Sequence, residues 1–358
     1  MKYMLIILYI LFGCSLVSSF ERDSIICNQY GRSTDRFFHN PILHSGADPW
    51  VMDVDKFYYY TQTMGNRIEL WKTSDLTKLN TSYHKTIWYP SINSGFFHDI
   101  WAPEIHYIKG KWYIYFTADS GDNRTHRIYV LENNSEDPME GSWKLIGKVS
   151  DSTNKWAIDP TVFELNDRWY ILWSGWQGNV NGEQDIYIAK LKNPWTIEGN
   201  RIRISSPFYP WERHGAIPGD FSSQVFVNEG PEILKKDGKI FLIYSVNGCW
   251  TDNYCLGMIE LTDTAQVLDS MFWKKFPKPV FYTSVQHHVY APGHCSFFKS
   301  PDQKEDWILY HANSNPGAGC GKERSPRIQP FTWTFDMKPD FGAPVSIDSI
   351  LQVPTGTQ

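Results

Sequence analysis

Ala102-Pro103-Glu104-Ile105, followed after a turn by Lys111-Trp112-Tyr113-Ile114-Tyr115-Phe116, is one copy of a pattern that recurs along the chain. The pattern joins a small or acidic residue, usually a proline, a β-branched position, a turn and an aromatic-rich strand. Self-similarity of this kind is the sequence signature of repeat architectures. The other copies lie at Ala47–Tyr60, Asp159–Trp173, Gly230–Tyr244 and Pro292–Tyr310.

Turn residues and further strand-like runs complete the repeating unit. Lys109-Gly110, Asn166-Asp167 and Asp237-Gly238 are hairpin signals between the first two strands of a copy. A third run follows most hairpins, and a fourth carries a tryptophan. Four strands recurring every ~55–70 residues form the sequence pattern of a propeller blade, whereas a β-sandwich would not repeat at this length. We therefore predict an all-β fold, a single five-bladed β-propeller with four-stranded antiparallel blades, over residues 20–358.

The N-terminus and the composition predict a secreted protein. Met4–Phe12 is an apolar run too short to span a bilayer, and Val17 and Ser19 suit a cleavage site, so residues 1–19 read as a signal peptide. The formal net charge of −5 argues against nucleic acid and suits a neutral substrate. Glycosylation sequons begin at Asn80, Asn123 and Asn133.

The cysteines allow disulfides in an oxidising compartment. Cleavage of the signal would remove Cys14. We expect Cys249 to pair with Cys255 and Cys295 with Cys320, which leaves Cys27 over. The alternative is that all five remaining cysteines are buried thiols. No pair of cysteines has the spacing of a zinc site.

Carboxylates and aromatic rings stand at matched positions of the copies. The first strand of each propeller blade lines the central channel, so residues at the starts of these strands converge at one mouth. Two carboxyl groups beside aromatic rings are what glycoside hydrolysis requires: one donates a proton and the other activates water or attacks carbon. The converging residues are Asp48, Trp101, Glu104, Asp159, Glu229, Glu232 and His294.

Structural interpretations compete with the catalytic one. An aspartate before proline commonly starts a turn, because its side chain caps the local backbone. Glu229 and Glu232 could flank a Gly-Pro turn at the surface. Repetition at matched positions favours function, since several acids at one mouth would repel one another without a purpose. Asp99 and Glu104 are weaker candidates, for holding a loop or binding a hydroxyl, and His294 suits either a structural role or an axial water or ion.

Taken in order, the motifs resemble glycoside hydrolase family 43, whose members are five-bladed propellers, over nearly all of the chain after the signal. The markers are Asn40-Pro41-Ile42-Leu43, Gly46-Ala47-Asp48-Pro49-Trp50-Val51, Ile100-Trp101-Ala102-Pro103-Glu104-Ile105, Trp156-Ala157-Ile158-Asp159, Asn228-Glu229-Gly230-Pro231, Arg324, Arg327-Ile328-Gln329-Pro330 and Asp340-Phe341-Gly342.

The resemblance implies a role for each acid. Asp48 would be the general base that activates water, and Glu229 the general acid, with Glu232 as the alternative acid. Asp159 would be the third carboxylate, which orients the acid and raises its pKa, because a nearby negative charge disfavours ionisation. The family inverts anomeric configuration, so the base and the acid should stand roughly 6.5–9.5 Å apart with water between them.

The resemblance also implies substrate-binding residues. Arg324 would lie near the sugar, although Arg327 is close enough in sequence to compete, His294 would stand on the axis, and Trp101 would stack on the sugar in the first subsite. No cofactor is required and no catalytic metal is expected. A structural ion such as calcium could occupy the axis.

Within the family, the chain most resembles exo-acting α-L-arabinofuranosidases. This implies removal of terminal arabinofuranosyl residues from arabinan, arabinoxylan or their oligosaccharides, outside the cell, with no nucleic-acid partner and no membrane association after signal cleavage. β-Xylosidase and endo-arabinanase activities are the alternatives within the family. A non-catalytic carbohydrate-binding propeller is an alternative of another class, whose sign would be loss of one of the three acids.

Overall fold

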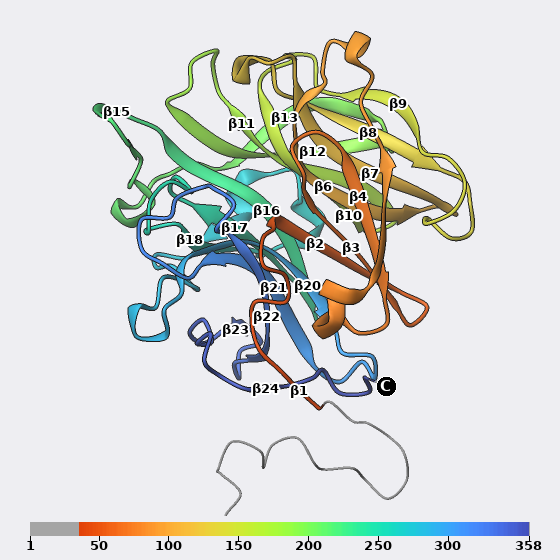
Figure 1. The fold of residues 1–358 in the computed structure, drawn as a ribbon. Helices are drawn as coiled ribbons and strands as arrows, with labels where there is room; N and C mark the ends of the chain where they lie inside the picture. The colour runs from red at the N-terminus through yellow and green to blue at the C-terminus, as the bar shows by residue number, and fades with distance from the viewer. Residues whose placement is uncertain (1–35, 358) are drawn as a thin grey trace, which may run out of the picture. The chain divides into compact units, whose positions relative to one another are not determined.

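The computed structural model describes residues 36–357, so the predicted signal peptide, Cys14 and Cys27 lie outside the described residues. The described chain is all-β, as the sequence predicts (Figure 1). Its helical pieces, all short 3-10 helices, are η1 Leu76–Thr81, η2 Ile92–Ser94, η3 Asn123–Thr125, η4 Pro210–Glu212, η5 Thr264–Gln266, η6 Ser270–Phe272 and η7 Val285–His287.

Groups of four antiparallel strands repeat along the described chain. Three of them are separate sheets, whereas the third and fourth groups are joined by a short parallel pairing of β12 with β16. The groups are β2 Ala47–Val54, β3 Phe57–Thr63, β4 Ile68–Thr73 and β5 Tyr83–Trp88; β6 His98–Ile108, β7 Lys111–Asp119, β8 Arg127–Asn133 and β9 Lys144–Val149; β10 Ala157–Leu165, β11 Arg168–Trp176, β12 Glu183–Asn193 and β13 Thr196–Ser205; β16 Phe226–Lys236, β17 Lys239–Val246, β18 Cys255–Leu261 and β19 Trp273–Lys275; and β20 Tyr290–Lys299, β21 Asp306–Asn313, β22 Ser325–Trp333 and β23 Pro339–Asp340.

The first strands of the five groups contact one another in a closed order. β2 contacts β6, β6 contacts β10, β10 contacts β16, β16 contacts β20, and β20 contacts β2 again. Figure 1 shows these strands near one another at the centre of the drawing. Residues at corresponding points of these strands are therefore neighbours in space although they lie far apart in the sequence.

Apolar side chains fill the space between consecutive groups. One core cluster joins the first two groups through residues such as Trp50 and Ile114, and another joins the last group to the first through Tyr60 and Trp307. Burying such a side chain contributes about 1.5–3 kcal/mol relative to leaving it exposed. The alternation of aromatic and β-branched residues in the repeated motif therefore produces faces that pack on both neighbours.

The two ends of the described chain are joined directly. Strand β1 (Phe37–Phe38) pairs antiparallel with β24 (Leu351–Gln352). The buried Asn40 side chain donates to the carbonyl of Ile328 at 2.8 Å and accepts from its N–H at 3.0 Å. These contacts link the N-terminal segment to the last group of strands. A small two-stranded sheet of β14 (Ala216–Ile217) and β15 (Asp220–Gln224) stands apart from the repeat.

The disulfide pairing expected from sequence is wrong. Cys249 is bonded to Cys320, across 71 residues, and Cys255 and Cys295 are buried free thiols. The reason lies in the strands: Cys255 begins β18 and faces a hydrophobic core, and Cys295 lies inside β20 in another core cluster. Sequence proximity misled the pairing because the loops after β17 and β21 meet in space.

Removing this disulfide should destabilise the protein measurably. A cross-link over a loop of this length removes enough entropy from the unfolded chain to contribute about 4 kcal/mol. In urea titrations we expect the free energy of unfolding of the Cys249→Ala, Cys320→Ala double variant to be lower by about 4 kcal/mol. Reducing agent should cause the same loss in the unaltered protein and none in the variant. Equal stability of the two oxidised proteins would contradict the pairing.

The sequons differ in accessibility. Asn80 and Asn123 are exposed, as a glycosylation site must be. Asn133 is only 1% exposed, and its side-chain amide donates to the carbonyl of Glu140 at 2.8 Å. The third sequon is therefore unsuited to carry a glycan in the folded protein. Among the described residues no helix has the length and apolar character to cross a membrane.

Candidate active site

The first strand of every group contains the same unusual backbone feature, a residue with positive φ directly before a proline. The φ values are 55° at Asp48, 43° at Ala102, 54° at Asp159, 52° at Gly230 and 51° at Ala291. The pairing register of each strand shifts at this point. Such bulges redirect side chains and are common beside active sites. The shared bulge therefore gives Asp48 and Asp159 equivalent positions. Glu229 lies one residue before the equivalent position in its own strand, which is Gly230.

Asp48 is held by donors from several strands. The Thr63 hydroxyl donates to Oδ2 at 2.6 Å, and Oδ1 lies 3.3 Å from Nη1 of Arg324 and 3.2 Å from Nδ1 of His294. The backbone N–H of Asp48 donates to Nδ1 of His311 at 3.0 Å. The side chain is 12% exposed, so this anchored carboxylate still reaches solvent.

The surroundings of Asp48 keep it ionised. Burial alone would raise its pKa, but the neighbouring His294, Arg324 and His311 and the Thr63 hydroxyl outweigh burial and hold the pKa well below the usual range. Burial lowers the pKa of both histidines. Near neutral pH the guanidinium of Arg324 is therefore the permanent positive charge beside Asp48. A carboxylate in this state can accept a proton.

Glu229 has the opposite protonation behaviour. Burial raises its pKa to about 7, and the charge of Asp48 adds to this effect, while a hydrogen bond from Tyr254 and the charge of Arg324 oppose it. The Tyr254 hydroxyl donates to Oε1 at 2.8 Å. The next residue, Gly230, has φ of 52°, and a Cβ there would lie 3.2 Å from the His294 ring, so a side chain at this position would crowd the ring.

Asp159 lies beside Glu229 and is almost completely buried, with 5% exposure. Its Oδ2 accepts the N–H of Gly230 at 3.0 Å. Burial, followed by the negative charges of Glu229 and Asp48, raises the pKa of Asp159 well above the usual value. The three acids singled out from the sequence therefore lie close enough for their charges to act on one another.

Trp101 lies next to this group and has a fixed ring. It is partly exposed, stacks on His126 with ring centroids 4.3 Å apart, and packs on a small cluster that includes Trp156. The next residue, Ala102, donates its N–H to the Thr63 hydroxyl at 2.8 Å. Because Thr63 also binds Asp48, a single side chain ties the strand of Trp101 to the carboxylate. This position agrees with a role in holding a sugar ring.

Comparison with known proteins identifies the family. A sequence profile of the glycosyl hydrolases family 43 matches residues 38–339, which is most of the chain. The chain belongs to glycosyl hydrolase family 43.

Two relatives of this family 43 chain have names that state an activity. The extracellular exo-α-(1→5)-L-arabinofuranosidase of Streptomyces avermitilis is 37% identical over 318 residues, which are 86% of this chain and 64% of that protein. A protein of the same name from Streptomyces chartreusis is 35% identical over 77% of this chain and 82% of its own length. This chain thus spans less than two thirds of the length of the first relative.

A solved structure resembles the chain along nearly its whole described length. The α-L-arabinofuranosidase of Lactobacillus brevis superposes with a TM-score of 0.80 and 33% identity, over 87% of this chain and 98% of that one. A thermostable family-43 glycoside hydrolase superposes with a TM-score of 0.73 at 23% identity, which supports the fold alone.

The geometry of this family 43 chain separates the competing candidates. Arg324 contacts Asp48, whereas Arg327 is fully buried and donates from Nη2 to Ser314 at 2.8 Å. Glu232, the alternative acid, is buried in the neighbourhood of Glu104, and burial raises the pKa of both carboxyls well above the usual value.

The weaker candidates Glu104 and Asp99 have other neighbours. Glu104 lies 3.1 Å from Nε2 of His106, and the charges of Glu232 and Asp159 act on it. Asp99 lies near Asp119 and His126, and burial, followed by the charge of Asp119, raises its pKa. Neither contacts Asp48 or Glu229. Within residues 36–357 no group of three or more His, Cys, Asp or Glu side chains is arranged to hold a metal ion, and the axial calcium stays a prediction.

Sequence reasoning missed three residues of the family 43 site: Thr63, Tyr254 and His311. Thr63 and His311 lie in second strands of their groups, β3 and β21, directly after or near the run of aromatic and aliphatic residues in each strand. Tyr254 follows the loop after β17 and stacks on His311 with ring centroids 5.7 Å apart. A histidine in an otherwise apolar strand, such as His311, was the available signal.

Replacing Tyr254 with phenylalanine should move the pH dependence of the family 43 site. The lost hydrogen bond favours the ionised form of Glu229, so its removal raises the pKa of Glu229. A hydrogen bond to a charged group contributes roughly 1.5–3 kcal/mol, so the pKa of Glu229 should rise by about one to two units. We expect the loss of kcat/KM at high pH to begin about one to two pH units later. Tyr282→Phe, at an exposed tyrosine, is the control and should leave the profile in place. An unshifted Tyr254→Phe profile would contradict this role.

Proposed function

We propose that this chain hydrolyses the glycosidic bond of terminal α-L-arabinofuranosyl residues in arabinan or arabinose-containing plant polysaccharide, with inversion of configuration. The observation that carries the proposal is the opposite protonation of two neighbouring carboxyls. Asp48 has a lowered pKa beside Arg324, and Glu229 has a pKa raised to about 7 beside Asp159. Titratable groups whose pKa values are driven apart are the mark of an acid and base pair.

The proposed reaction uses each carboxyl once. Asp48 takes a proton from a water molecule as the water oxygen attacks the anomeric carbon. Glu229 gives its proton to the glycosidic oxygen as the bond between that oxygen and the anomeric carbon breaks. Asp159 orients the backbone that follows Glu229 by accepting the N–H of Gly230. Both carboxyls then return to their starting state by exchange of one proton with water.

The substrate-binding residues in this proposal are Trp101, His294 and Arg324. Arg324 and His294 hold Asp48 in place. We assign to both the further role of binding sugar hydroxyls. Trp101 offers a fixed aromatic face. The substrate assignment is supported by the relatives named exo-α-(1→5)-L-arabinofuranosidase and by the solved arabinofuranosidase.

The proposal includes the architecture and the location of the protein. We propose that the five groups of strands are the blades of one propeller, supported by the closed order of first-strand contacts and by the shared bulge before proline. We also propose secretion, supported by the apolar N-terminus and by relatives named extracellular. Hydrolysis by this route calls for no cofactor, so activity should survive chelation.

A panel of three substrates tests the proposal. Purified protein is incubated with aryl α-L-arabinofuranoside, aryl β-xyloside and linear arabinan, and products are separated by chromatography. Free arabinose from the first and third, without oligosaccharides, is the expected result. Oligosaccharides from arabinan would indicate an endo-arabinanase, and xylose alone a β-xylosidase. Binding without any product would indicate a non-catalytic carbohydrate-binding protein.

A further inference from the structure

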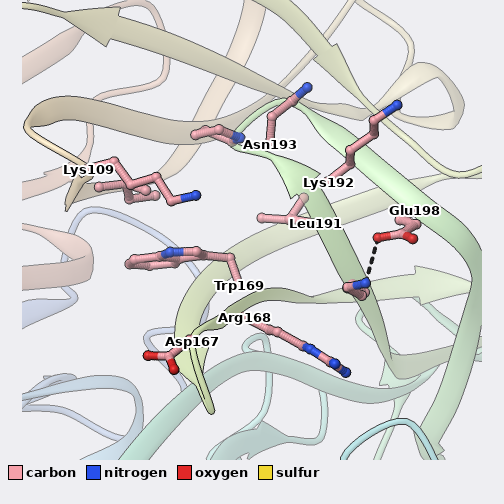
Figure 2. Close-up of a pocket in the computed structure, with 11 residues that line it drawn as sticks. Lys109, Asp167, Arg168, Trp169, Leu191, Lys192, Asn193 and Glu198 are labelled. Atoms are coloured by element: carbon pink, nitrogen blue, oxygen red, sulfur yellow. Dashed lines mark ion pairs between the residues drawn. The ribbon is translucent and has the colours of Figure 1, made fainter.

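A pocket of about 200 Å³ (Figure 2) is lined by residues that follow the first strands β6 and β10, at the opposite end of these strands from the three acids. It is built by the hairpin turn after β6 at Lys109, the turn after β10 at Asp167 and the end of β12 at Lys192. Asp159 stands near the start of β10, and the strand runs six residues further to Leu165, or about 20 Å at the rise of a β-strand. A ligand here would leave the candidate active site open.

The pocket contains one half-buried aromatic ring. Trp169 packs against a core cluster and also lines the pocket. Figure 2 shows its indole on the same side of the pocket as the side chains of Lys109 and Asp167. A tryptophan placed this way offers a large apolar surface and one N–H donor. The packing on the core keeps the ring in place, so little side-chain entropy is lost when a ligand binds.

The charges that line the pocket are unbalanced. The side chains of Arg168 and Lys192 extend from the side of the pocket opposite the ring (Figure 2). Lys190 is paired with Glu198 at 2.7 Å. The side chains of the three other cations that line the pocket form no hydrogen bond or ion pair within residues 36–357, although the charges of Arg168 and Lys192 act on Glu198. The pocket's other acid is Asp167. The three cations are Lys109, Arg168 and Lys192. The pocket is therefore positive on a chain whose formal net charge is −5.

We propose that this pocket binds a uronate residue of an acidic polysaccharide. An aromatic surface suits the apolar face of a sugar ring, and Arg168 offers the planar fork that binds carboxylates through two hydrogen bonds. The volume is below the ~300–1,000 Å³ of pockets that enclose a small molecule, so it suits one sugar unit of a longer chain. Nucleic acid is disfavoured, because it calls for an extended basic surface.

The consequence is a second attachment point on the polymer. When the protein is anchored to a polysaccharide through this pocket, the neighbouring side branches of that polysaccharide are present at a high effective concentration near the candidate active site. No new contact at the three acids is needed. This part of the inference rests on the proposed function. Binding at the pocket does not, because it is measured without turnover.

Isothermal titration with an α-1,4-linked galacturonate trimer tests the pocket, with neutral linear arabinan oligosaccharide as the comparison ligand. We expect the trimer to bind, and binding to weaken as salt is raised. The Arg168→Ala, Lys192→Ala double variant and Trp169→Ala should each weaken trimer binding at least tenfold. Lys278→Ala, at an exposed lysine without an ion pair, removes one charge elsewhere and should bind the trimer normally.

Two measurements keep the outcomes distinct. Because Trp169 touches the core, thermal unfolding of Trp169→Ala is recorded. If Trp169→Ala is unstable, the conclusion rests on the Arg168→Ala, Lys192→Ala double variant. Turnover of aryl α-L-arabinofuranoside should be unchanged in all these variants, so failure of the pocket and failure of the active site are separable. No trimer binding, equal binding by the double variant, or equal binding of an RNA oligonucleotide at the same salt would each overturn the proposal.

Discussion

Replacing Asp48 with asparagine should lower kcat on an aryl α-L-arabinofuranoside by about 10²–10⁴-fold, the range that general acid–base catalysis supplies. An amide has nearly the same shape and can still accept from the Thr63 hydroxyl, but it cannot take a proton from water. KM should change little. The loss should hold for every leaving group, because activation of water does not depend on which bond breaks.

Asp237→Asn is the matched control for this variant. Asp237 is an exposed hairpin residue with φ of 46°, so the same substitution is made at a similar backbone conformation, beyond the far end of a first strand. It should retain full activity. A kcat within a few-fold of the unaltered protein for Asp48→Asn would remove Asp48 from the role of general base.

Replacing Glu229 with glutamine should produce a loss that depends on the leaving group. With arabinan, whose leaving oxygen needs a proton, we expect kcat/KM to fall by about 10²–10⁴-fold. With an activated aryl arabinofuranoside the loss should be far smaller, because a good leaving group departs without protonation. Assays with a series of aryl substrates of graded leaving-group pKa measure this dependence directly.

The pH profile provides an independent readout of Glu229. The group must be protonated to act, so kcat/KM of the unaltered protein should fall as pH rises through about 7, the raised pKa of Glu229. This decline should be absent in Glu229→Gln. Glu140→Gln, at an exposed glutamate, should keep it. A loss in Glu229→Gln that is equal for all leaving groups would point to a binding or structural role.

Much of the site could be predicted from the sequence because it is built from a repeat. The five residues before proline occupy equivalent points of five first strands, so their convergence follows from the repeat alone. Asp48 and Asp159 are two of these residues, and Glu229 adjoins a third. Their distinct environments could not be predicted, because Thr63 and His311 follow the aromatic runs of their second strands and Tyr254 follows a loop, all outside the repeated motif.

Pairings made through loops were the part that sequence could not supply. Cys249 lies six residues from Cys255 but bonds to Cys320, since two loops after different second strands meet. Asn133 has the triplet of a glycosylation site, yet its side chain is buried. Local spacing carries no information on either, because both depend on how neighbouring groups of strands pack.

The stereochemistry of the reaction tests most directly whether Asp48 is the general base and Glu229 the general acid. Proton NMR of the first product formed from an aryl α-L-arabinofuranoside, recorded before the sugar equilibrates, reports the configuration at the anomeric carbon. If Asp48 activates water while Glu229 protonates the leaving oxygen, β-L-arabinofuranose must appear first. Initial release of α-L-arabinofuranose would mean that a carboxylate attacks carbon, and would contradict the roles assigned to Asp48 and Glu229.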